Sequence, residues 1–380
     1  MKSITYCILI SLLLYNCTPK QQQKTLHDKI QGSWIEINAD SILQDSDNIP
    51  PPFKIPFGIT FQKSSVDFFR QFNKYERDTI TGKHSYSTFV GFVPYQLKAD
   101  SLFIQHPLKN DLVFKGTIDA SNKDTLVLKR IDSTYLTLVP LPKKEKDSLH
   151  FDQVVLSRSG CFGTCPIMNI SIHRNGSVVF YGEKHTDLIG LYKTKLSPEF
   201  TNYLFKKLED IQISKVATSY SVGHTDDETV FSTFIKNGKI VKSISDYGQA
   251  GTKELLWAYK ATLNLYKQLS LTSIPIHKET PKLNNIYFDK GAKRLLLGKS
   301  ETFLLWLAIQ NATITPANFE KEYTFPGGYY ETNLKKIESN GQLYKVYLKN
   351  GHITTYDIGY NFIEQNFTEK DFKELKEIKW

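Results

Sequence analysis

The chain between Ile30 and about Pro142 consists of short apolar-rich runs separated by turn residues. Alternating apolar and polar positions, with many β-branched and aromatic residues, favour strands over helices. We expect strands at Ser33–Ile37, Gly58–Gln62, Val66–Phe69, Ser85–Phe92, Tyr95–Lys98, Leu102–Gln105, Val113–Ile118, Thr125–Lys129 and Tyr135–Val139. About eight or nine strands are enough to close a small barrel, so residues 30–142 are predicted to form an all-β barrel.

The pattern changes after residues 140–147, a charged and proline-containing stretch that is typical of a linker. We therefore place a domain boundary near residue 145. Between residues 151 and 270, strands alternate with amphipathic helices, which indicates an α+β domain. The expected strands are Val154–Arg158, Ile167–His173, Val178–Gly182, Val230–Ile235 and Ile240–Ile244, with hairpin turns at Asn175-Gly176 and Asn237-Gly238. One helix is expected to begin at Ser197-Pro198-Glu199 and another to run from Glu254 to Leu269.

Residues 281–380 are predicted to form a further α+β region, with a helix at Phe303–Gln310 and a closing amphipathic helix from Glu369 to about Ile378. Lys349-Asn350-Gly351 echoes Lys236-Asn237-Gly238, and each hairpin leads to an aspartate, Asp357 or Asp246. This similarity predicts a degenerate partial repeat of the preceding domain. The fold class expected for the whole chain is mixed β and α+β.

The amino terminus has the features of an export signal. Lys2 precedes an apolar run from Ile8 to Leu14, which is shorter than the roughly 20 residues that a membrane span requires. We expect residues 1–16 to be a cleaved signal peptide, Cys17 to be the first mature residue, and residues 17–29 to be a polar tether. The alternative is an ordinary secretory signal with an incidental cysteine.

Leu14-Tyr15-Asn16-Cys17 resembles the relaxed lipobox of bacterial lipoproteins, especially those of Bacteroidota. The resemblance implies that Cys17 is acylated and that membrane lipid is a partner of the chain. The segment after Cys17 lacks the acidic residues that mark export to the cell surface in some of these lipoproteins. We therefore expect a lipid-anchored protein of the outer membrane that faces the periplasm.

Composition and charge narrow the choice of partners. Hydrophobic residues make up 40% and charged residues 23% of the 380 residues, which is ordinary for a soluble globular protein. The net charge of +9 is spread along the chain without a polybasic block. A basic envelope protein is attracted to anionic headgroups and acidic glycans, whereas its compartment argues against nucleic acid; the alternative is a generic solvated surface.

Cys161 and Cys165 are the sharpest internal motif. Once Cys7 is removed and Cys17 is acylated, they are the two remaining thiols, and they lie in an oxidising compartment. We expect a disulfide that fixes one turn. A redox-active dithiol and a metal site remain as alternatives, and the metal site would need His173, His185 or His224 to complete its ligands.

The same segment resembles a known domain family. Leu156 to Pro166, then Asn175-Gly176, Val179 to Gly182, Thr225-Asp226 and Asp246-Tyr247-Gly248 look like the uncharacterised Cys-Phe-Gly-x-Cys-Pro domain of bacterial envelope proteins. The resemblance extends over residues 151–269 and implies no established activity. Gly32-Ser33-Trp34 similarly resembles the Gly-x-Trp signature of lipocalin-like domains, in which the tryptophan plugs the closed end of the barrel.

Arg158, His224, Asp226 and Asp227 are the candidates for a polar binding site, and a solvated acidic turn is the interpretation that the sequence favours over it. The sequence has no Gly-x-Ser-x-Gly, His-Glu-x-x-His, phosphate-binding glycine-rich or EF-hand motif. We therefore predict no catalytic residues, no metal and no cofactor.

These observations favour a lipid-anchored, non-catalytic envelope protein that binds an envelope protein, a glycan or, inside the barrel, a small apolar ligand. The barrel could equally be filled by its own side chains. One alternative is a thiol-disulfide oxidoreductase that uses Cys161 and Cys165. Another is a protein-binding module or inhibitor that presents the loop between these cysteines.

Overall fold

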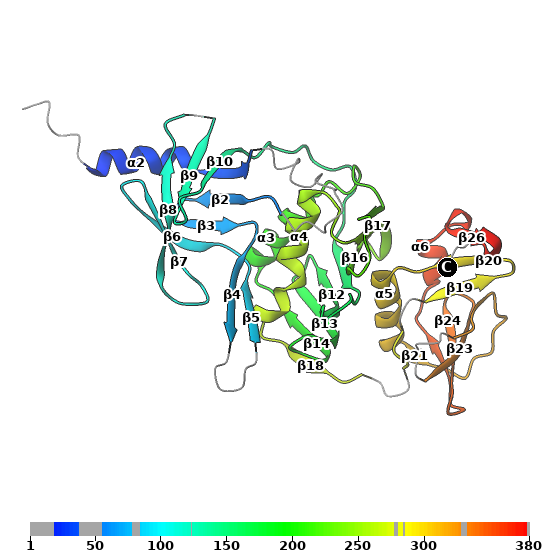
Figure 1. The fold of residues 1–380 in the computed structure, drawn as a ribbon. Coiled ribbons are helices and arrows are strands. Elements are labelled where there is room, and N and C mark those ends of the chain that lie inside the picture. Colours follow the sequence, from blue (N-terminus) through cyan, green and yellow to red (C-terminus); the bar gives the residue numbers. More distant parts are fainter. Residues whose placement is uncertain are drawn as a thin grey trace, which may run out of the picture. The chain divides into compact units, whose positions relative to one another are not determined.

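The computed structural model describes residues 19–37, 55–77, 84–122, 124–276, 280–283, 286–327 and 333–377. The predicted signal peptide and Cys17 lie outside these residues. The chain divides into two compact units, residues 1–145 and 146–380. Figure 1 shows the ribbon of both units.

Within the described residues, the first unit contains a closed antiparallel barrel in the order β1-β10-β9-β8-β7-β6-β3-β2. Its strands are β1 (Gly32–Glu36), β2 (Gly58–Gln62), β3 (Ser65–Phe68), β6 (Val93–Lys98), β7 (Ser101–Gln105), β8 (Leu112–Asp119), β9 (Leu126–Arg130) and β10 (Tyr135–Pro140). The predicted barrel is thus confirmed. The predicted strand at 85–92 corresponds to β5 (His84–Phe89), which pairs with the unpredicted β4 (Phe72–Arg77) in a separate hairpin.

The barrel interior is packed with the chain's own side chains. Buried positions alternate along β6 and β7, as expected for strands with one inward face. Phe61 and Tyr95 meet edge to face, with their ring centroids 5.3 Å apart. Trp34 is buried, and its indole N–H donates to the carbonyl of Ile30 over 2.7 Å. Fifteen buried apolar residues form one continuous cluster there.

Residues Pro19–Ile30, which overlap the predicted polar tether at 17–29, form helix α2. Leu26 and Ile30 lie one helical turn apart and both pack on the barrel cluster, where Ile30 is fully buried. Lysine and glutamine, which fill much of the segment, have good helix propensity. Packing of this apolar pair explains the helix that polarity alone did not indicate.

The second unit is organised around an eight-stranded sheet, here called the central sheet, in the order β15-β17-β16-β11-β12-β13-β14-β18. Its strands are β11 (Gln153–Arg158), β12 (Ile167–His173), β13 (Ser177–Lys184), β14 (Gly190–Lys195), β15 (Ser219–Ser221), β16 (Thr229–Lys236), β17 (Lys239–Tyr247) and β18 (Thr272–Ile274). Asn237 and Gly238 both have positive φ, 49° and 77°, as the predicted β16–β17 hairpin turn requires. The edge strands β15 and β18, and β14 beside β18, were not predicted.

One face of the central sheet, here called the apolar face, is covered by α3 (Pro198–Glu209) and α4 (Lys253–Leu263) (Figure 1). Ser197 caps α3, as its sequence predicted. Phe205 of α3 stacks on Phe151, whose ring also meets Phe234 of β16. The second helix is shorter than predicted, because Leu265–Gln268 form a separate 3₁₀ turn, η2.

The other face of the central sheet, here called the polar face, is covered by α5 (Lys299–Gln310). Ser157, Asn169, Thr233 and Ser243 lie on this face, and Thr233 and Ser243 bond to α5. Tyr181 stacks on Trp306 of α5 with the ring centroids 4.8 Å apart. Helix α5 therefore joins residues 281–380 to the central sheet in one compact unit.

Behind α5 lies a second eight-stranded sheet, in the order β21-β25-β24-β23-β22-β19-β20-β26. Its strands are β19 (Tyr287–Lys290), β20 (Lys293–Leu296), β21 (Thr313–Ile314), β22 (Tyr323–Phe325), β23 (Leu334–Ser339), β24 (Leu343–Leu348), β25 (Ile353–Asp357) and β26 (Phe372–Glu374). Short helix α6 (Phe362–Asn366) follows β25. The two sheets differ in strand order, so the predicted repeat is not confirmed.

The predicted closing helix is wrong. Residues 369–377 form the 3₁₀ turn η3 (Glu369–Asp371), β26 and the 3₁₀ turn η4 (Leu375–Glu377). Phe372 is buried in the core behind the sheet, and β26 pairs with β20. The backbone N–H and C=O groups of this segment form hydrogen bonds with the edge of the sheet. The residues around Phe372 are mostly charged, so a helix here would have no apolar stripe to bury.

Candidate functional site

The predicted disulfide is present in the loop between β11 and β12. Cys161 and Cys165 are bonded, with their Cα atoms 5.6 Å apart. The loop protrudes, because Gly160, Phe162, Gly163 and Thr164 are exposed while both cysteines are half-buried. Gly163 has a φ of +151°, which bends the chain back within the ring and which side-chain-bearing residues rarely adopt.

Phe162 is the most exposed large apolar side chain among the described residues, with an exposed fraction of 87%. Its backbone is nevertheless held, since its N–H donates to the carbonyl oxygen of Asp226 over 3.0 Å. Ser159 and Thr229 bond twice, from the Ser159 N–H to the Thr229 carbonyl and from the Thr229 N–H to the Ser159 hydroxyl. These hydrogen bonds attach the disulfide-closed loop to the segment that leads into β16.

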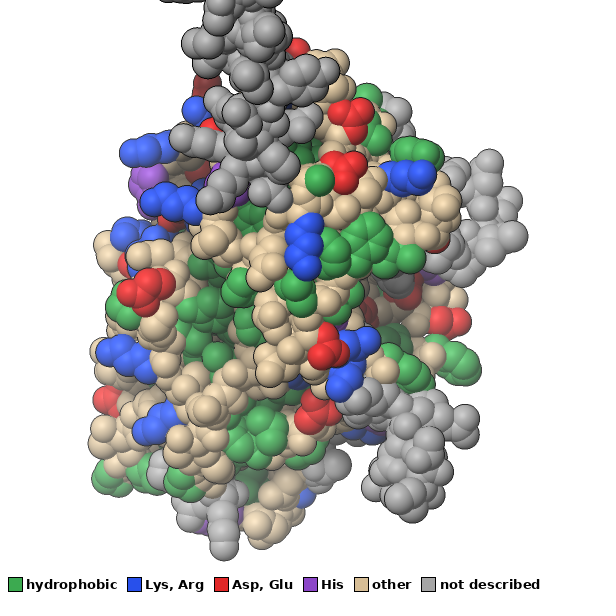
Figure 2. Space-filling view, turned by 90° about the vertical axis from the view of Figure 1, so that its left-hand side faces the viewer, with side chains coloured by type: hydrophobic (Ala, Val, Ile, Leu, Met, Phe, Trp, Pro, Cys, Tyr) green, Lys and Arg blue, Asp and Glu red, His purple; other side chains and the backbone are tan. Residues whose placement is uncertain are grey.

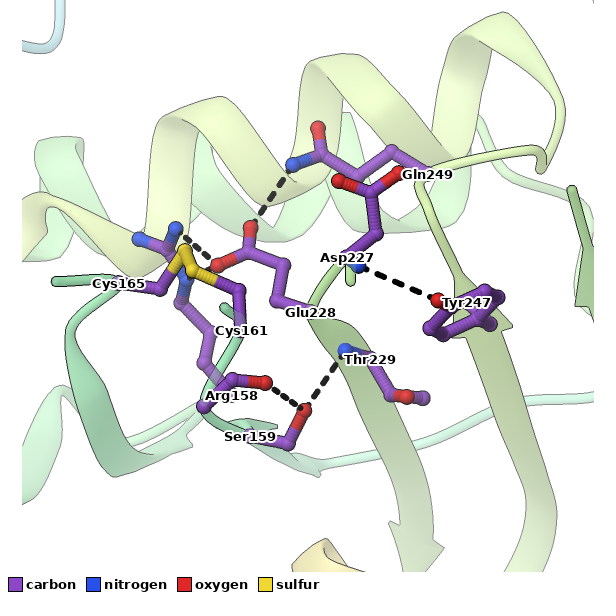
Figure 3. The surroundings of a disulfide bond; sticks show 10 residues. Arg158, Ser159, Cys161, Cys165, Asp227, Glu228, Thr229, Tyr247 and Gln249 are labelled. Atoms are coloured by element: carbon purple, nitrogen blue, oxygen red, sulfur yellow. Dashed lines mark hydrogen bonds and ion pairs between the residues drawn. A yellow bond between two sulfur atoms is a disulfide. The ribbon is translucent and has the colours of Figure 1, made fainter. Parts of the chain in front are cut away.

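Beneath the loop, Arg158 and Glu228 form an ion pair (Figure 3). The Arg158 Nε donates to Glu228 Oε2 over 2.9 Å, and Gln249 donates to the other carboxylate oxygen over 2.9 Å. The side-chain exposed fractions are 15% and 6%, so the pair is largely desolvated. Such a pair costs much to break because one charge is then left without a partner.

Lys260 of α4 brings a second cation close to Arg158. Burial lowers the pKa of the Lys260 ammonium, the charge of Arg158 lowers it further, and Glu228 acts in the opposite direction. Arg158, Glu228 and Lys260 thus interact electrostatically with one another. Glu228, Gln249 and Lys260 were missed at the sequence level. Glu228 directly follows the predicted pair, so its position was the one signal that could have identified it.

The structure brings together only some of the predicted site residues. His224 and Asp227 pair with each other, with 2.6 Å between Nε2 and Oδ2, instead of joining Arg158. Asp226 contributes its backbone carbonyl, and its φ of +79° is unusual for a residue with a side chain. The Asp227 N–H donates to the hydroxyl of Tyr247. The segment 224–227 is therefore a braced turn beside the disulfide loop.

Asp246 is a buried carboxyl on the apolar face, in the same row across the sheet as Val230 and Arg158. One oxygen accepts the N–H of Gly251 over 3.1 Å, and the other has no hydrogen-bond partner among the described residues. Burial raises the pKa of Asp246 to about 6, although the backbone hydrogen bonds from Ala250 and Gly251 act in the opposite direction. A Cβ on Gly251 would lie 2.6 Å from the second oxygen, so this carboxyl is closely packed against the loop before α4.

These features limit the chemistry of the loop. Both sulfurs are bonded to each other, and Pro166 leads into strand β12 instead of a helix whose N-terminus would stabilise a thiolate. Among the described residues, no group of three or more His, Cys, Asp or Glu is placed to hold a metal ion. No helix in the described part of the chain is long and apolar enough to cross a membrane.

Figure 2 shows one face of the molecule, on which Lys and Arg side chains lie among acidic, apolar and uncharged ones. The face drawn there has no continuous basic patch.

Residues 152–266 match the family described as Domain of unknown function (DUF6438). This segment contains the disulfide loop, the Arg158–Glu228 pair and α3 and α4, and it nearly coincides with the predicted domain at 151–269. Neither the curated proteins nor the solved structures contain a match to the chain.

Proposed function

We propose that this chain is a non-catalytic envelope protein that binds another envelope protein through Phe162 on the disulfide-closed loop. The observation that carries the proposal is the 87% exposed fraction of this phenylalanine on a covalently closed ring. A large exposed aromatic is costly in water, and aromatic residues are enriched among the residues that dominate binding energy at interfaces.

The loop is preorganised for such a contact. The disulfide, the Phe162 N–H bond to Asp226 and the two Ser159–Thr229 bonds restrict the backbone before any partner arrives. Fixing a loop in advance reduces the conformational entropy lost on binding. The desolvated Arg158–Glu228 pair supports the loop from below.

The proposal includes the expected location. The chain would be a Bacteroidota-type lipoprotein, anchored through acylated Cys17 in the outer membrane and facing the periplasm, and its matched domain would be the Cys-Phe-Gly-x-Cys-Pro domain. The first unit would be a lipocalin-like barrel. Its continuous apolar cluster supports a barrel filled by its own side chains over one that holds a small apolar ligand.

Site-specific photocrosslinking in the native envelope tests the proposal. A benzophenone amino acid placed at position 162 should capture one defined partner. The same probe at position 131, where Ile131 is 68% exposed on the first unit, is the matched control. Replacing both Cys161 and Cys165 with serine keeps the probe at position 162 but opens the ring, and we expect capture to fall at least about tenfold.

Equal capture at positions 162 and 131, or capture unaffected by opening the ring, would contradict the proposal. A redox titration addresses the oxidoreductase alternative with Cys161 and Cys165. A structural disulfide should have a reduction potential below about −300 mV, whereas a markedly more oxidising potential would favour that alternative.

A further inference from the structure

A second feature of the molecule lies on the polar face of the central sheet, away from the disulfide loop. An open groove with a volume of about 450 Å³ runs between this face, α5 and the segment after β25. This volume falls within the range of small-molecule clefts in proteins. The groove joins the matched domain to the C-terminal region, so its two sides come from distant parts of the sequence.

The floor of the groove is polar. It is formed by Gln153, Ser171, His173, Asn175 and Ser177, from β11, β12, β13 and the turn between the last two strands. The Gln153 amide nitrogen donates to the Ser171 hydroxyl, and the Asn175 N–H donates to His173 Nδ1. The Gln153 Oε1, the His173 Nε2 and the Ser177 hydroxyl have no hydrogen-bond partner among the residues that the structure describes, so they remain available to a ligand.

The wall of the groove is apolar. Leu304, Leu307 and Ala308 belong to one stripe of α5 at helical spacing, and that stripe ends in the amide of Asn311. Tyr360 lies on the other side, and within the described part of the chain its hydroxyl has no hydrogen-bond partner. None of the twelve lining residues is Asp, Glu, Lys or Arg, although charged residues make up 23% of the chain.

We infer that this groove binds a neutral saccharide. A sugar ring presents C–H groups that pack on aliphatic and aromatic side chains, and hydroxyl groups that both donate and accept, as amide, hydroxyl and imidazole groups do. An ionised ligand would find no carboxylate, ammonium or guanidinium group among the lining residues. An extended peptide is disfavoured because β11, β12 and β13 are interior strands whose backbone groups are already paired on both sides.

Titration calorimetry and saturation-transfer NMR on the full chain test this inference. The probes are two neutral disaccharides, cellobiose and di-N-acetylchitobiose, with the charged sugars glucosamine and glucuronic acid for comparison. At least one neutral disaccharide should bind at about 10 mM or below, and the charged sugars at least about tenfold more weakly. Absence of binding by both neutral sugars, or equal binding of the charged ones, overturns the inference.

Two variants locate the binding site. Ala308→Arg places a long charged side chain in the groove from a half-exposed position on α5, and it should abolish binding. Tyr360→Ala removes the aromatic side and should weaken binding at least about tenfold. Tyr135→Ala, at a 63% exposed tyrosine of the first unit, is the matched control and should bind as the unaltered chain does.

Circular dichroism and melting temperature establish that each variant is folded. Binding that persists undiminished in both folded groove variants would contradict the inference. The outcome is independent of the proposed function, because neither Phe162 nor the disulfide lines the groove.

Discussion

The two faces of the central sheet are stabilised by different interactions, although both belong to the same strands. On the apolar face, Leu156, Ile170 and Phe180 are fully buried beneath α3, α4 and η2, which follow them closely in sequence. On the polar face, Ser157 and Asn169 lie beneath α5, which comes more than a hundred residues later. The first face is stabilised mainly by apolar burial, and the second combines apolar contacts with paired polar groups.

Paired polar groups at the polar face include a buried ion pair. Glu183 is bonded to Lys299 at the start of α5 and to Lys282, with 2.8 Å between its Oε2 and the Lys282 Nζ. Burial raises the pKa of Glu183, but the two ammonium groups and their hydrogen bonds outweigh burial, and its pKa lies below the usual value. The Ser157 hydroxyl and the Asn169 Oδ1 have no hydrogen-bond partner among the described residues. This face thus tolerates polar groups that a purely apolar interface would exclude.

The largest effect is expected from a cavity on the apolar face. Phe205→Ala removes a fully buried ring that stacks on Phe151, and it should lower the free energy of unfolding by about 3–5 kcal/mol in urea denaturation. Phe200→Ala, at a partly exposed position on the same helix, is the control and should cost about 1 kcal/mol or less. Similar losses in the two variants would refute the view that burial dominates this face.

Asp246 provides a further test of the difference between the two faces, because it is a buried acid on the apolar face. Its pKa of about 6 in the folded chain exceeds the unfolded value, so its proton stabilises the fold at low pH. This stabilisation is fully present below about pH 4 and is lost as the pH rises through about 6. The loss lowers the free energy of unfolding by up to about 3 kcal/mol.

Asp246→Asn keeps an acceptor for the Gly251 N–H but cannot ionise, so this loss should vanish. Melting temperatures of the variant and of the unaltered chain should therefore diverge between about pH 4 and pH 7, with the stability of the variant rising relative to that of the unaltered chain. A difference in melting temperature that stays constant over this range would show that the buried carboxyl does not ionise there.

The smallest effect is expected at the polar face. The Thr233 hydroxyl lies 2.7 Å from that of Ser300 and also within hydrogen-bond distance of Ser243. Thr233→Val keeps the shape but leaves these hydroxyls with one partner fewer, which should cost about 1 kcal/mol. Ser232→Ala, which removes the corresponding bond to Tyr259 on the apolar face, provides the comparison in the same denaturation experiment. A loss at Thr233 as large as that from Phe205→Ala would reverse the proposed ranking of the two faces.

Local patterns predicted much of this fold. Period-two alternation identified the barrel strands, Ser197-Pro198 identified the start of α3, and Asn237-Gly238 identified a hairpin, because each signal reflects an interaction within a few residues. Helix α2 and strand β26 were missed because Ile30 and Phe372 are stabilised by contacts with distant strands. The apolar positions of those segments have no informative spacing of their own.

The candidate site was predicted less completely. The cysteine pair was identified because the two residues were the thiols that remained in the predicted mature chain and lie close enough in sequence to form a bonded ring. The Arg158–Glu228 pair, Gln249 and Lys260 depend on strand register and on how α4 lies over the sheet, which no local pattern encodes. The groove was not predicted from the sequence for the same reason, because α5 lines it only through packing between distant parts of the chain.

The position of α5 also constrains how the protein reaches its folded state. Tyr181 and Ile235 belong to the same buried cluster as Trp306, so the central sheet has an incomplete interior until the later part of the chain is available. During amino-to-carboxyl synthesis, the matched domain is complete while an apolar strip of its central sheet is still uncovered. A fragment cut near residue 270 would retain that strip permanently, and it is therefore a natural client for holding chaperones and a poor surrogate for the intact chain.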